Sequence, residues 1–501
     1  MPSESELSEQ LDAAENAFHR NKFKLAKRLC EQVLRKQPEH PDTLHLLGLV
    51  RLRQGDLTVA EALLRRSIAA DASKPAAHAN LGIVLTAVGR HQEAIANYQT
   101  AAELDSNVVE VWNNLAASLR SEGRLNEAHD AIVRAIECEP RAAELRLNFG
   151  NLLLEQNRVD EAIAAFRKAL KLNPEMEAAK LQLGTTLIDI GRVDESIPIL
   201  QTATDQHADN AQFPYNLGLA FARSNRSPEA MTAYRKAIDR DPRYVRARES
   251  LGRLLERTGA VDEAIAECRE WLKVDADNAI AQHMLAASSG TGVPQRASNE
   301  YVKSTFDEMA EHFDSSLAKL DYAGPQLVTD AVKDLNLAER SADILDAGCG
   351  TGLCGDHLRT YAKTLTGVDL SGDMLKHAQR RNVYDTLDEC ELTEFLNTHP
   401  LSADLIVAAD TFIYFGDLTA LFEAAYAALR PAGVLIFTLE HGSSDHDFNL
   451  CSHGRYSHSE AYLRSSLVAA ELRAIGITSE TLRIENGQPA IGLLVTARKP
   501  D

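Results

Sequence analysis

The chain has 501 residues, 45% of them hydrophobic and 25% charged, an ordinary balance for a globular protein with room for about three domains. No apolar run approaches the ~20 residues that span a bilayer, and the N-terminus MPSESELSEQ lacks the features of a secretory signal, so we expect a cytoplasmic protein. A net charge of -20 disfavours nucleic acid as a partner.

The seven cysteines are odd in number and scattered through the chain. They form no C-x-x-C pair and no Cys/His cluster at zinc spacing. We therefore expect reduced thiols and no metal site.

A period of 34 residues runs through the first 290 residues. A large residue followed by a small one recurs at this spacing without insertion, from Leu47-Gly48 to Leu285-Ala286. A further small residue follows 12 positions later, from Ala60 to Ala264. Apolar residues within each unit are spaced i, i+3, i+4, i+7, which predicts two amphipathic helices. One such pair cannot bury both faces, so the pairs must stack into a solenoid.

Turn residues mark the ends of these helices. Gly or Asn stands where the first helix of a unit must stop, and proline follows the second helix in several units. The turn positions are Gly55, Gly89, Gly123, Asn157, Gly191, Asn225 and Gly259, and the prolines are Pro38, Pro140, Pro174 and Pro242.

This pattern resembles the tetratricopeptide (TPR) repeat over about eight units, from Leu7 to Asn278. With a terminal helix, the predicted all-α TPR solenoid spans residues 7–287. The resemblance implies that the concave face holds a protein or peptide.

A ladder of carboxamides sharpens this expectation. Asn80, Asn114, Asn148 and Asn216 each lie two residues before the small residue of a unit, on the predicted inner face. A carboxamide can both donate to and accept from an extended peptide backbone. The ladder resembles the asparagine ladder in the TPR superhelix of O-linked N-acetylglucosamine transferases; the alternative is a set of polar residues on a solvated helix face.

A second domain follows a linker. Residues 288–300, SSGTGVPQRASNE, are rich in Gly, Ser, Asn and Pro, and we place the boundary there. After two helical stretches, short apolar runs alternate with helical segments over residues 301–501. Strands are expected at 342–348, 364–370, 403–410, 434–440, 478–487 and 490–499, with helices at 354–362, 372–381, 418–429 and 462–476. Repeated β-α units predict a parallel, doubly wound sheet that binds its ligand at the carboxyl ends of the strands.

The first such end carries a glycine-rich loop, Asp346-Ala347-Gly348-Cys349-Gly350-Thr351-Gly352. Glycines let a backbone approach a ligand, and nicotinamide, flavin and S-adenosylmethionine (SAM) sites all use such loops. Two carboxylates discriminate among them. Asp346 suits a cationic ligand better than a pyrophosphate, and Asp369, 21 residues after Gly348, can accept both hydroxyls of a ribose.

These motifs, with GVDLS, ADLIVAAD and LRPAGVLIF, resemble those of class I SAM-dependent methyltransferases. The resemblance implies a Rossmann-like α/β domain, mainly parallel with an antiparallel C-terminal strand, and SAM as methyl donor. It implies that the methionine part of SAM meets Asp346, Gly348, Gly350 and Gly352, and that Asp369 holds the ribose. Leu370 and Met374 would flank the adenine. Glu391, followed by Leu392, would meet the adenine amino group, with Asp388 and Glu389 as competing choices.

The whole chain also resembles predicted bacterial methyltransferases with TPR repeats, through FDEMAEHFD, ADTFIYFGDL, GRYSHSEAYLR and ENGQPAIGLLVTARKP. Phe306 and Phe313, in the first of these segments, would cover the donor site or pack in an ordinary core.

Methyl transfer needs a general base only when the acceptor is protonated. Asp410 at the end of a strand, and Tyr456 and His458 in HGRYSH, are the expected catalytic residues, with Tyr414, His441 and His453 as alternatives. Asp410 could instead cap a helix, and His458 could be a surface residue.

Three functions fit the sequence. The first is a methyltransferase whose TPR array presents a protein or an attached group. The second is a small-molecule methyltransferase with the array as assembly scaffold, and the third is a non-catalytic TPR adaptor. A nicotinamide oxidoreductase is a more distant fourth.

Overall fold

The computed structural model describes residues 4–485 and 487–501. The chain forms two compact units, Met1–Arg226 and Ser227–Asp501. No helix among the described residues combines the length and the apolar character that a membrane crossing needs.

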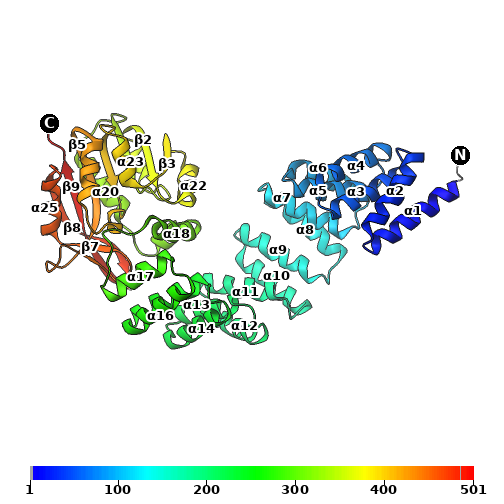
Figure 1. Cartoon of the computed structure of the whole chain (residues 1–501), viewed down its shortest axis with the longest axis horizontal. Coiled ribbons are helices and arrows are strands. Elements are labelled where there is room, and N and C mark those ends of the chain that lie inside the picture. Colours follow the sequence, from blue (N-terminus) through cyan, green and yellow to red (C-terminus); the bar gives the residue numbers. More distant parts are fainter. Residues whose placement is uncertain (1–3, 486) are drawn as a thin grey trace. The chain divides into compact units, whose positions relative to one another are not determined.

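The first unit consists of antiparallel helix pairs, which confirms the all-α repeat architecture (Figure 1). Its helices are α1 (Glu4–His19), α2 (Phe23–Lys36), α3 (Pro41–Arg53), α4 (Leu57–Ala70), α5 (Pro75–Ala87), α6 (His91–Leu104), α7 (Val109–Ser121), α8 (Leu125–Cys138), α9 (Ala143–Glu155), α10 (Val159–Leu172), α11 (Glu177–Asp189), α12 (Val193–Gln206) and α13 (Gln212–Arg223). The repeat continues into the second unit with α14 (Ser227–Arg240), α15 (Val245–Arg257), α16 (Val261–Val274) and α17 (Ala279–Ser289).

The turn and small residues act as the sequence predicts. All seven predicted turn residues have positive φ, from 57° at Asn225 to 80° at Gly55, so each helix pair reverses through a left-handed residue. The small residues allow close packing within a pair. A Cβ built on Gly150 would lie 2.4 Å from the ring of Phe166, and one on Gly82 would lie 2.6 Å from Tyr98.

The last helices of the repeat share a hydrophobic core with the second domain. Trp271 and Met284 pack in one cluster with Ala297, Tyr301 and Tyr456. The contact is also polar, because the His283 ring Nε2 lies 2.8 Å from the carbonyl oxygen of Gly454. In Figure 1, α17 accordingly runs beside β7. The division between compact units thus falls before α14, whereas the sequence places a linker at 288–300.

The second domain is a nine-stranded mixed sheet. Its strands are β1 (Ala342–Ala347), β2 (Ala362–Asp369), β3 (Thr386–Glu389), β4 (Ala403–Ala408), β5 (Leu429–His441), β6 (Phe448–Leu450), β7 (Tyr456–His458), β8 (Arg473–Glu485) and β9 (Gln488–Arg498). The order β3-β2-β1-β4-β5 is parallel throughout, and β9 pairs antiparallel with β5 and β8. This arrangement confirms a mainly parallel sheet with an antiparallel C-terminal strand.

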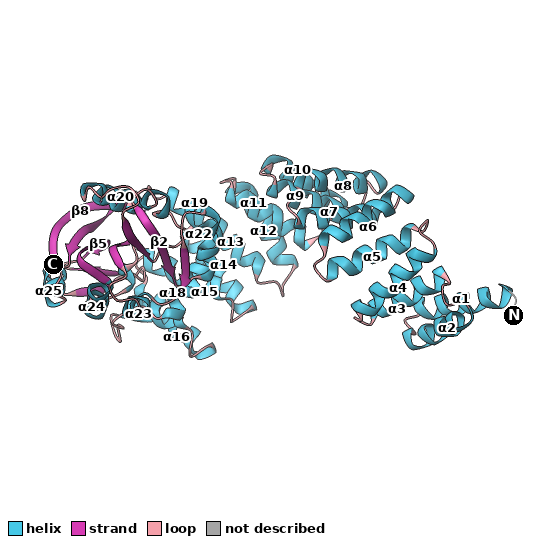
Figure 2. Cartoon of the chain, turned by 90° about the horizontal axis from the view of Figure 1, so that it is seen from above, coloured by secondary structure: helices cyan, strands magenta, loops and turns pink. Residues whose placement is uncertain are grey.

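Helices cover both faces of this sheet, as the near-continuous apolar runs of β1, β4 and β5 require (Figure 2). One core contains α20 (Gly324–Asp334) and α21 (Gly355–Leu358). The other contains α23 (Leu392–Thr398), α24 (Thr419–Ala428) and α25 (Glu460–Ala469). The remaining elements are α18 (Asn299–Met309), the short turns η1 (Ala310–His312) and η2 (Phe412–Tyr414), α19 (Phe313–Ala318) and α22 (Gly372–Arg381).

One expectation about the elements was wrong. The helix expected over 462–476 ends at Ala469, and residues from Arg473 onward belong to β8 because they pair with β9. In the segment 288–300, where a domain boundary stays a prediction, the carbonyl of Gln295 accepts the backbone N–H groups of Gly416 and Asp417. The sequence also gave no signal for the short β6–β7 pair.

Candidate active site

A cavity of about 270 Å³ opens at the carboxyl ends of the parallel strands. Most of the residues predicted to hold the methyl donor line it: Asp346, Gly348, Gly350, Asp369, Leu370, Glu391 and Leu392. They meet there because β1, β2 and β4 are parallel neighbours, so the loops that follow them lie at one sheet edge.

Asp346 ends β1 and is only 1% exposed. Its Oδ2 accepts a 2.6 Å hydrogen bond from the phenol of Tyr384, a residue that sequence reasoning missed. Burial raises the pKa of Asp346 to about 7, against the opposing effect of the Tyr384 hydrogen bond. Among the described residues no basic side chain pairs with this carboxylate, so a cationic ligand would stabilise its charged form.

Asp369 ends β2 and faces the same cavity. Its two carboxylate oxygens accept backbone N–H groups, from Gly350 at 2.9 Å and from Ser371 at 2.8 Å. Burial raises its pKa, and these hydrogen bonds lower it. Each oxygen keeps a second lone pair, so the carboxylate can still accept from ligand hydroxyls while it holds the glycine loop.

Two glycines of the loop serve packing within the protein. A Cβ on Gly348 would lie 2.3 Å from the side chain of Thr411, which anchors the following loop by donating to the carbonyl of Ala347. A Cβ on Gly352 would lie 3.0 Å from the ring of Tyr384. Gly352 does not line the cavity, and its predicted contact with the methionine part of SAM stays a prediction.

The residues expected around the adenine separate into two groups. Leu370 and Leu392 line the cavity, whereas Met374 is fully buried in α22 outside its lining. Glu391 lines the cavity, but its oxygens are engaged: Oε1 accepts from Arg296 at 2.8 Å, and Oε2 caps α23 through the N–H of Glu394.

The segment before the first strand covers the donor side of the cavity. Phe306 of α18 and Phe313 of α19 both line it, with ring centroids 5.9 Å apart. Polar contacts attach the segment to the sheet. Ser371 Oγ donates to Asp307 at 2.6 Å, and Asp314 accepts from the Thr351 hydroxyl at 2.5 Å. The segment therefore lies where a lid would lie.

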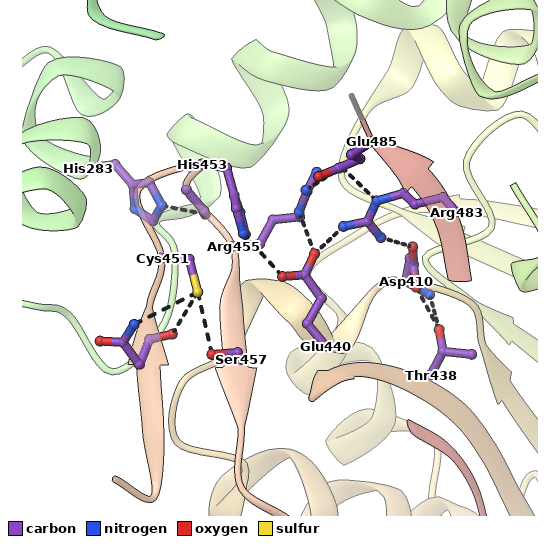
Figure 3. Close-up of polar contacts among 12 residues, drawn as sticks. His283, Asp410, Thr438, Glu440, Cys451, His453, Arg455, Ser457, Arg483 and Glu485 are labelled. Atoms are coloured by element: carbon purple, nitrogen blue, oxygen red, sulfur yellow. Dashed lines mark hydrogen bonds and ion pairs between the residues drawn. The ribbon is translucent and has the colours of Figure 1, made fainter. Parts of the chain in front are cut away.

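A charge cluster, whose contacts Figure 3 shows, contributes Asp410, Arg455 and Arg483 to the lining of the cavity. Arg483 of β8 is bound by three carboxylates, through Nη1 to Asp410 at 3.0 Å, through Nη2 to Glu440, and through Nε to Glu485 at 2.7 Å. Arg455 donates to Glu440 at 2.7 Å and to Glu485 at 2.6 Å. Only Arg483 among these four residues contacts Asp410 directly. Sequence reasoning missed the cluster, because its members converge from β5, β8 and a loop.

Asp410 lines the cavity, as expected for a residue facing ligands. It adopts a left-handed backbone conformation, with φ of 53°. Oδ1 accepts from the hydroxyl of Thr438 at 2.7 Å, and Oδ2 is paired with Arg483. Burial raises the pKa of Asp410, and Arg483 opposes that shift. The arginine competes with any proton that the carboxylate would take from an acceptor.

Tyr456 and His458 were expected to be catalytic, but neither lines the cavity. The Tyr456 hydroxyl donates to the carbonyl of Pro294 at 2.8 Å, and His458 Nε2 lies 3.0 Å from the carbonyl oxygen of Gly416. Both side chains are fully buried, and burial lowers the pKa of His458 to about 4. In this structure their polar atoms bond loop carbonyls, and their catalytic role stays a prediction that the cavity lining does not support.

His453 from the same loop does line the cavity. Its Nε2 lies 3.3 Å from Glu440 Oε2, and Cys451 lies close enough that the three side chains could share a metal ion. Glu440 is already neutralised by Arg455 and Arg483, whose positive charges disfavour a metal ion there.

The repeat contributes to the cavity too. Arg253 of α15 lines it together with Arg296 and Tyr301. Next to it, Arg246 of the same helix forms an ion pair with Glu308 of α18. The last helix pairs thus border the same cavity as the glycine loop.

The predicted asparagine ladder lies half-buried or buried along the first helices of its units. Its side chains already make local hydrogen bonds. Asn80 Nδ2 lies 2.9 Å from His45 Nε2, Asn148 donates to Asn113, and Asn216 donates to the carbonyl of Gln212. Each carboxamide oxygen keeps its capacity to accept from a peptide.

Comparison with known families agrees with both halves. Residues 345–435 match the model of a methyltransferase domain, and residues 181–243 and 223–279 match that of the tetratricopeptide repeat. Residues 6–184 match the C-terminal domain of cilia and flagella-associated protein 70. The chain therefore combines TPR repeats with a methyltransferase domain.

Curated relatives resemble the second domain. Over 153 residues the chain is 29% identical to malonyl-[acyl-carrier protein] O-methyltransferase of Yersinia pestis, covering 30% of this chain and 55% of that protein. It is 31% identical over 102 residues to the mitochondrial ubiquinone biosynthesis O-methyltransferase of Rattus norvegicus (19% and 30%). It is 31% identical over 159 residues to methyltransferase-like protein 27 of Homo sapiens (31% and 62%). The chain spans less than two thirds of each of these relatives.

Solved structures resemble the repeats. YrrB, described as a TPR protein with an unusual peptide-binding site, is 24% identical with a TM-score of 0.33, covering 37% of this chain and 95% of that one. The C-terminal part of a TPR protein from Cytophaga hutchinsonii is 15% identical with a TM-score of 0.43, covering 48% and 99%.

Proposed function

We propose that the second domain binds SAM and transfers its methyl group to an acceptor presented by the TPR repeats. The observation that supports SAM as the donor is a pair of carboxylates at the cavity, the buried Asp346 and the half-buried Asp369, on either side of the glycine loop. SAM, when bound, supplies a methyl group that its positively charged sulfonium activates. Its ammonium and sulfonium charges suit two carboxylates that have no basic partner, and a ribose suits Asp369.

The protein's own contribution to transfer is alignment and exclusion of water. The glycine loop and Asp369 would fix the nucleoside, and Phe306 and Phe313 would exclude solvent from the donor side. Asp410 and Arg483, which also line the cavity, would then limit the positions in which an acceptor can bind. Arg483 holds the Asp410 carboxylate in an ion pair, so Asp410 is poorly suited to act as a general base.

The position of Arg253 supports the proposal that the repeats deliver the acceptor. This residue belongs to a repeat helix and lines the cavity, so the end of the array is part of the acceptor's entrance. Several of the relatives are described as acting on malonyl-[acyl-carrier protein], a small group attached to a protein. We propose an acceptor of that kind: a protein, or a group that a protein carries, held in the TPR groove.

The alternative is a small free acceptor with the array as assembly scaffold. The ubiquinone biosynthesis O-methyltransferases among the relatives favour it. The two proposals differ in whether the inner face of the array matters for turnover.

The test uses the full chain, methyl-labelled SAM and a cell extract. Changing Asn80, Asn114 and Asn148 together to Ala should reduce label in the protein fraction at least tenfold, because three backbone contacts are removed. SAM binding by calorimetry should not change. A matched triple change of exposed polar residues on second helices, Gln92, Asn126 and Lys168 to Ala, is the control.

Label that enters only small molecules, and enters equally with the asparagine variant, would establish the scaffold alternative. Calorimetry in which the unaltered chain binds no SAM would leave only a TPR adaptor.

A further inference from the structure

Tyr384 lies between α22 and β3, outside every motif that points to a methyltransferase. Its hydroxyl donates to Oδ2 of Asp346 at 2.6 Å. This is the one hydrogen bond that the Asp346 side chain receives from residues 4–485 and 487–501. The other oxygen, Oδ1, has no hydrogen-bond partner within that range.

Three glycines make room for the phenol. A Cβ on Gly355 would lie 2.5 Å from the Tyr384 hydroxyl, and one on Gly352 or on Gly367 would lie 3.0 Å from its ring. A Cβ at 2.5 Å would displace the ring, so this path from Tyr384 to the buried carboxylate depends on the absence of side chains. Part of the glycine pattern that resembles a ligand-binding loop thus accommodates a side chain of the protein itself.

We propose that Tyr384 is a positioning residue for the donor site, which holds Asp346 with one oxygen occupied and directs the other toward a cationic ligand. This inference rests on the proposed function, because it takes the cation to be the ammonium of SAM. The phenol O–H donates its hydrogen bond to an oxygen of the carboxylate. A hydrogen bond donated to the charged form stabilises that form, so Tyr384 favours ionised Asp346.

The groups that act on Asp346 come from several elements. They are Asp369 at the end of β2, Cys349 and Cys354 in the glycine loop, Tyr322 before α20 and Tyr384 itself. None of them is a cation. Burial raises the pKa of Asp346 to about 7 and Tyr384 opposes that rise. Loss of the phenol should therefore raise this pKa further.

The affinity for SAM should depend on pH through the charge of Asp346. A cation prefers ionised Asp346, so affinity falls as the pH falls through the pKa of the carboxyl group. If the pKa rises by about one unit in Tyr384→Phe, the variant binds SAM about tenfold more weakly than the unaltered chain at pH 6 and less than twofold more weakly at pH 8.5. The comparison uses the ratio of the dissociation constants of the variant and the unaltered chain at the same pH. SAM has the same protonation state in both titrations, so its own titration cancels in this ratio.

The experiment is calorimetric titration of SAM into the full chain and into Tyr384→Phe, at pH 6.0, 7.0 and 8.5. Tyr361→Phe is the matched control, because that ring packs on the same domain while its hydroxyl has no partner in the described chain. The proposal is supported if the ratio of the variant's dissociation constant to that of the unaltered chain falls with rising pH for Tyr384→Phe and stays at one for Tyr361→Phe. A ratio of one throughout, or a loss that is equal at all three pH values, overturns it.

A second measurement separates this inference from the proposed function. The Asp346 carboxyl carbon is followed by NMR in ligand-free protein labelled at aspartate, with assignment by loss of its signal in Asp346→Asn. The pH at the midpoint of this carboxyl titration should be higher in Tyr384→Phe than in the unaltered chain. If the unaltered chain binds no SAM but the midpoint rises, the donor assignment fails and the positioning role of Tyr384 stands; an unmoved midpoint refutes that role.

Discussion

At the scale of single residues, the proposed donor site combines a cost in stability with a carboxylate suited to a cation. Asp346 is buried without a basic partner among the described residues, and its pKa of about 7 lies far above the ordinary value of 3.8. The folded protein therefore binds a proton that the unfolded chain has lost between these pH values, and its stability falls as the pH rises from about 4 to about 7. Selection for stability alone would remove such a group.

Asp346→Asn should consequently stabilise the ligand-free protein. At one pKa unit per ~1.4 kcal/mol, about three units predict a gain of roughly 2–4 kcal/mol above pH 7, and a smaller gain at pH 5. Differential scanning fluorimetry at pH 8 and pH 5 measures the difference as a rise in melting temperature. Asp373→Asn, at an exposed position that pairs only with Lys376, should give no such rise. An equal gain at both pH values would show that charge burial is not the cause.

At the scale of elements, polar contacts attach α19 to the rest of the domain. No side chain of α19 is buried. Asp314 at its start accepts from Thr351 and from Arg381, the latter at 2.6 Å. These two contacts connect α19 both to the glycine loop and to α22.

Asp314→Ala should loosen α19 without unfolding the sheet. Because two hydrogen bonds to a charged group are lost, amide exchange over residues 310–320 should accelerate by about tenfold or more. Exchange in β1 and β4 should not change. Asp330→Ala in α20 is a control, since that side chain bonds only Gln326 and Lys333 on its own helix. Unchanged exchange in Asp314→Ala would mean that the apolar contacts of Phe313 suffice to hold the segment.

At the scale of the whole molecule, the end of the repeat and the methyltransferase domain fold around one core. Trp271 and Met284 of the repeat pack with Tyr301 and Tyr456. The ring of His283 also stacks on that of Tyr301, with centroids 3.8 Å apart. A cut at the end of the sequence repeat would expose this core, whereas a cut before α14 would leave it intact.

A chain that begins at Ser227 should therefore unfold cooperatively and remain monomeric. One that begins at Tyr301 should melt more than 10 °C lower or aggregate, because it lacks the buried indole of Trp271 and the other repeat side chains of that core. Near-UV circular dichroism and size-exclusion chromatography distinguish the two outcomes. Equal stability of both fragments would place the boundary at residues 288–300, where composition alone puts it.

The sequence by itself determined the features that depend on local spacing. A 34-residue period with left-handed turn residues defines helix pairs, and alternating apolar runs define a parallel sheet, since each pattern has few ways to bury its apolar faces. The strand-end carboxylates Asp346 and Asp369 were predictable for the same reason, because parallel topology places consecutive loops at one edge.

Only the tertiary structure decided which side chains meet from distant segments. Arg483 pairs with Asp410, the carboxylate that the sequence offered for catalysis, and Glu440 and Arg455 join the same cluster from a strand and a loop whose pairing no local pattern encodes. Tyr384 reaches Asp346 across a space left by glycines. Burial and ion pairing set the state of each charged group, and both depend on neighbours that are remote in the chain.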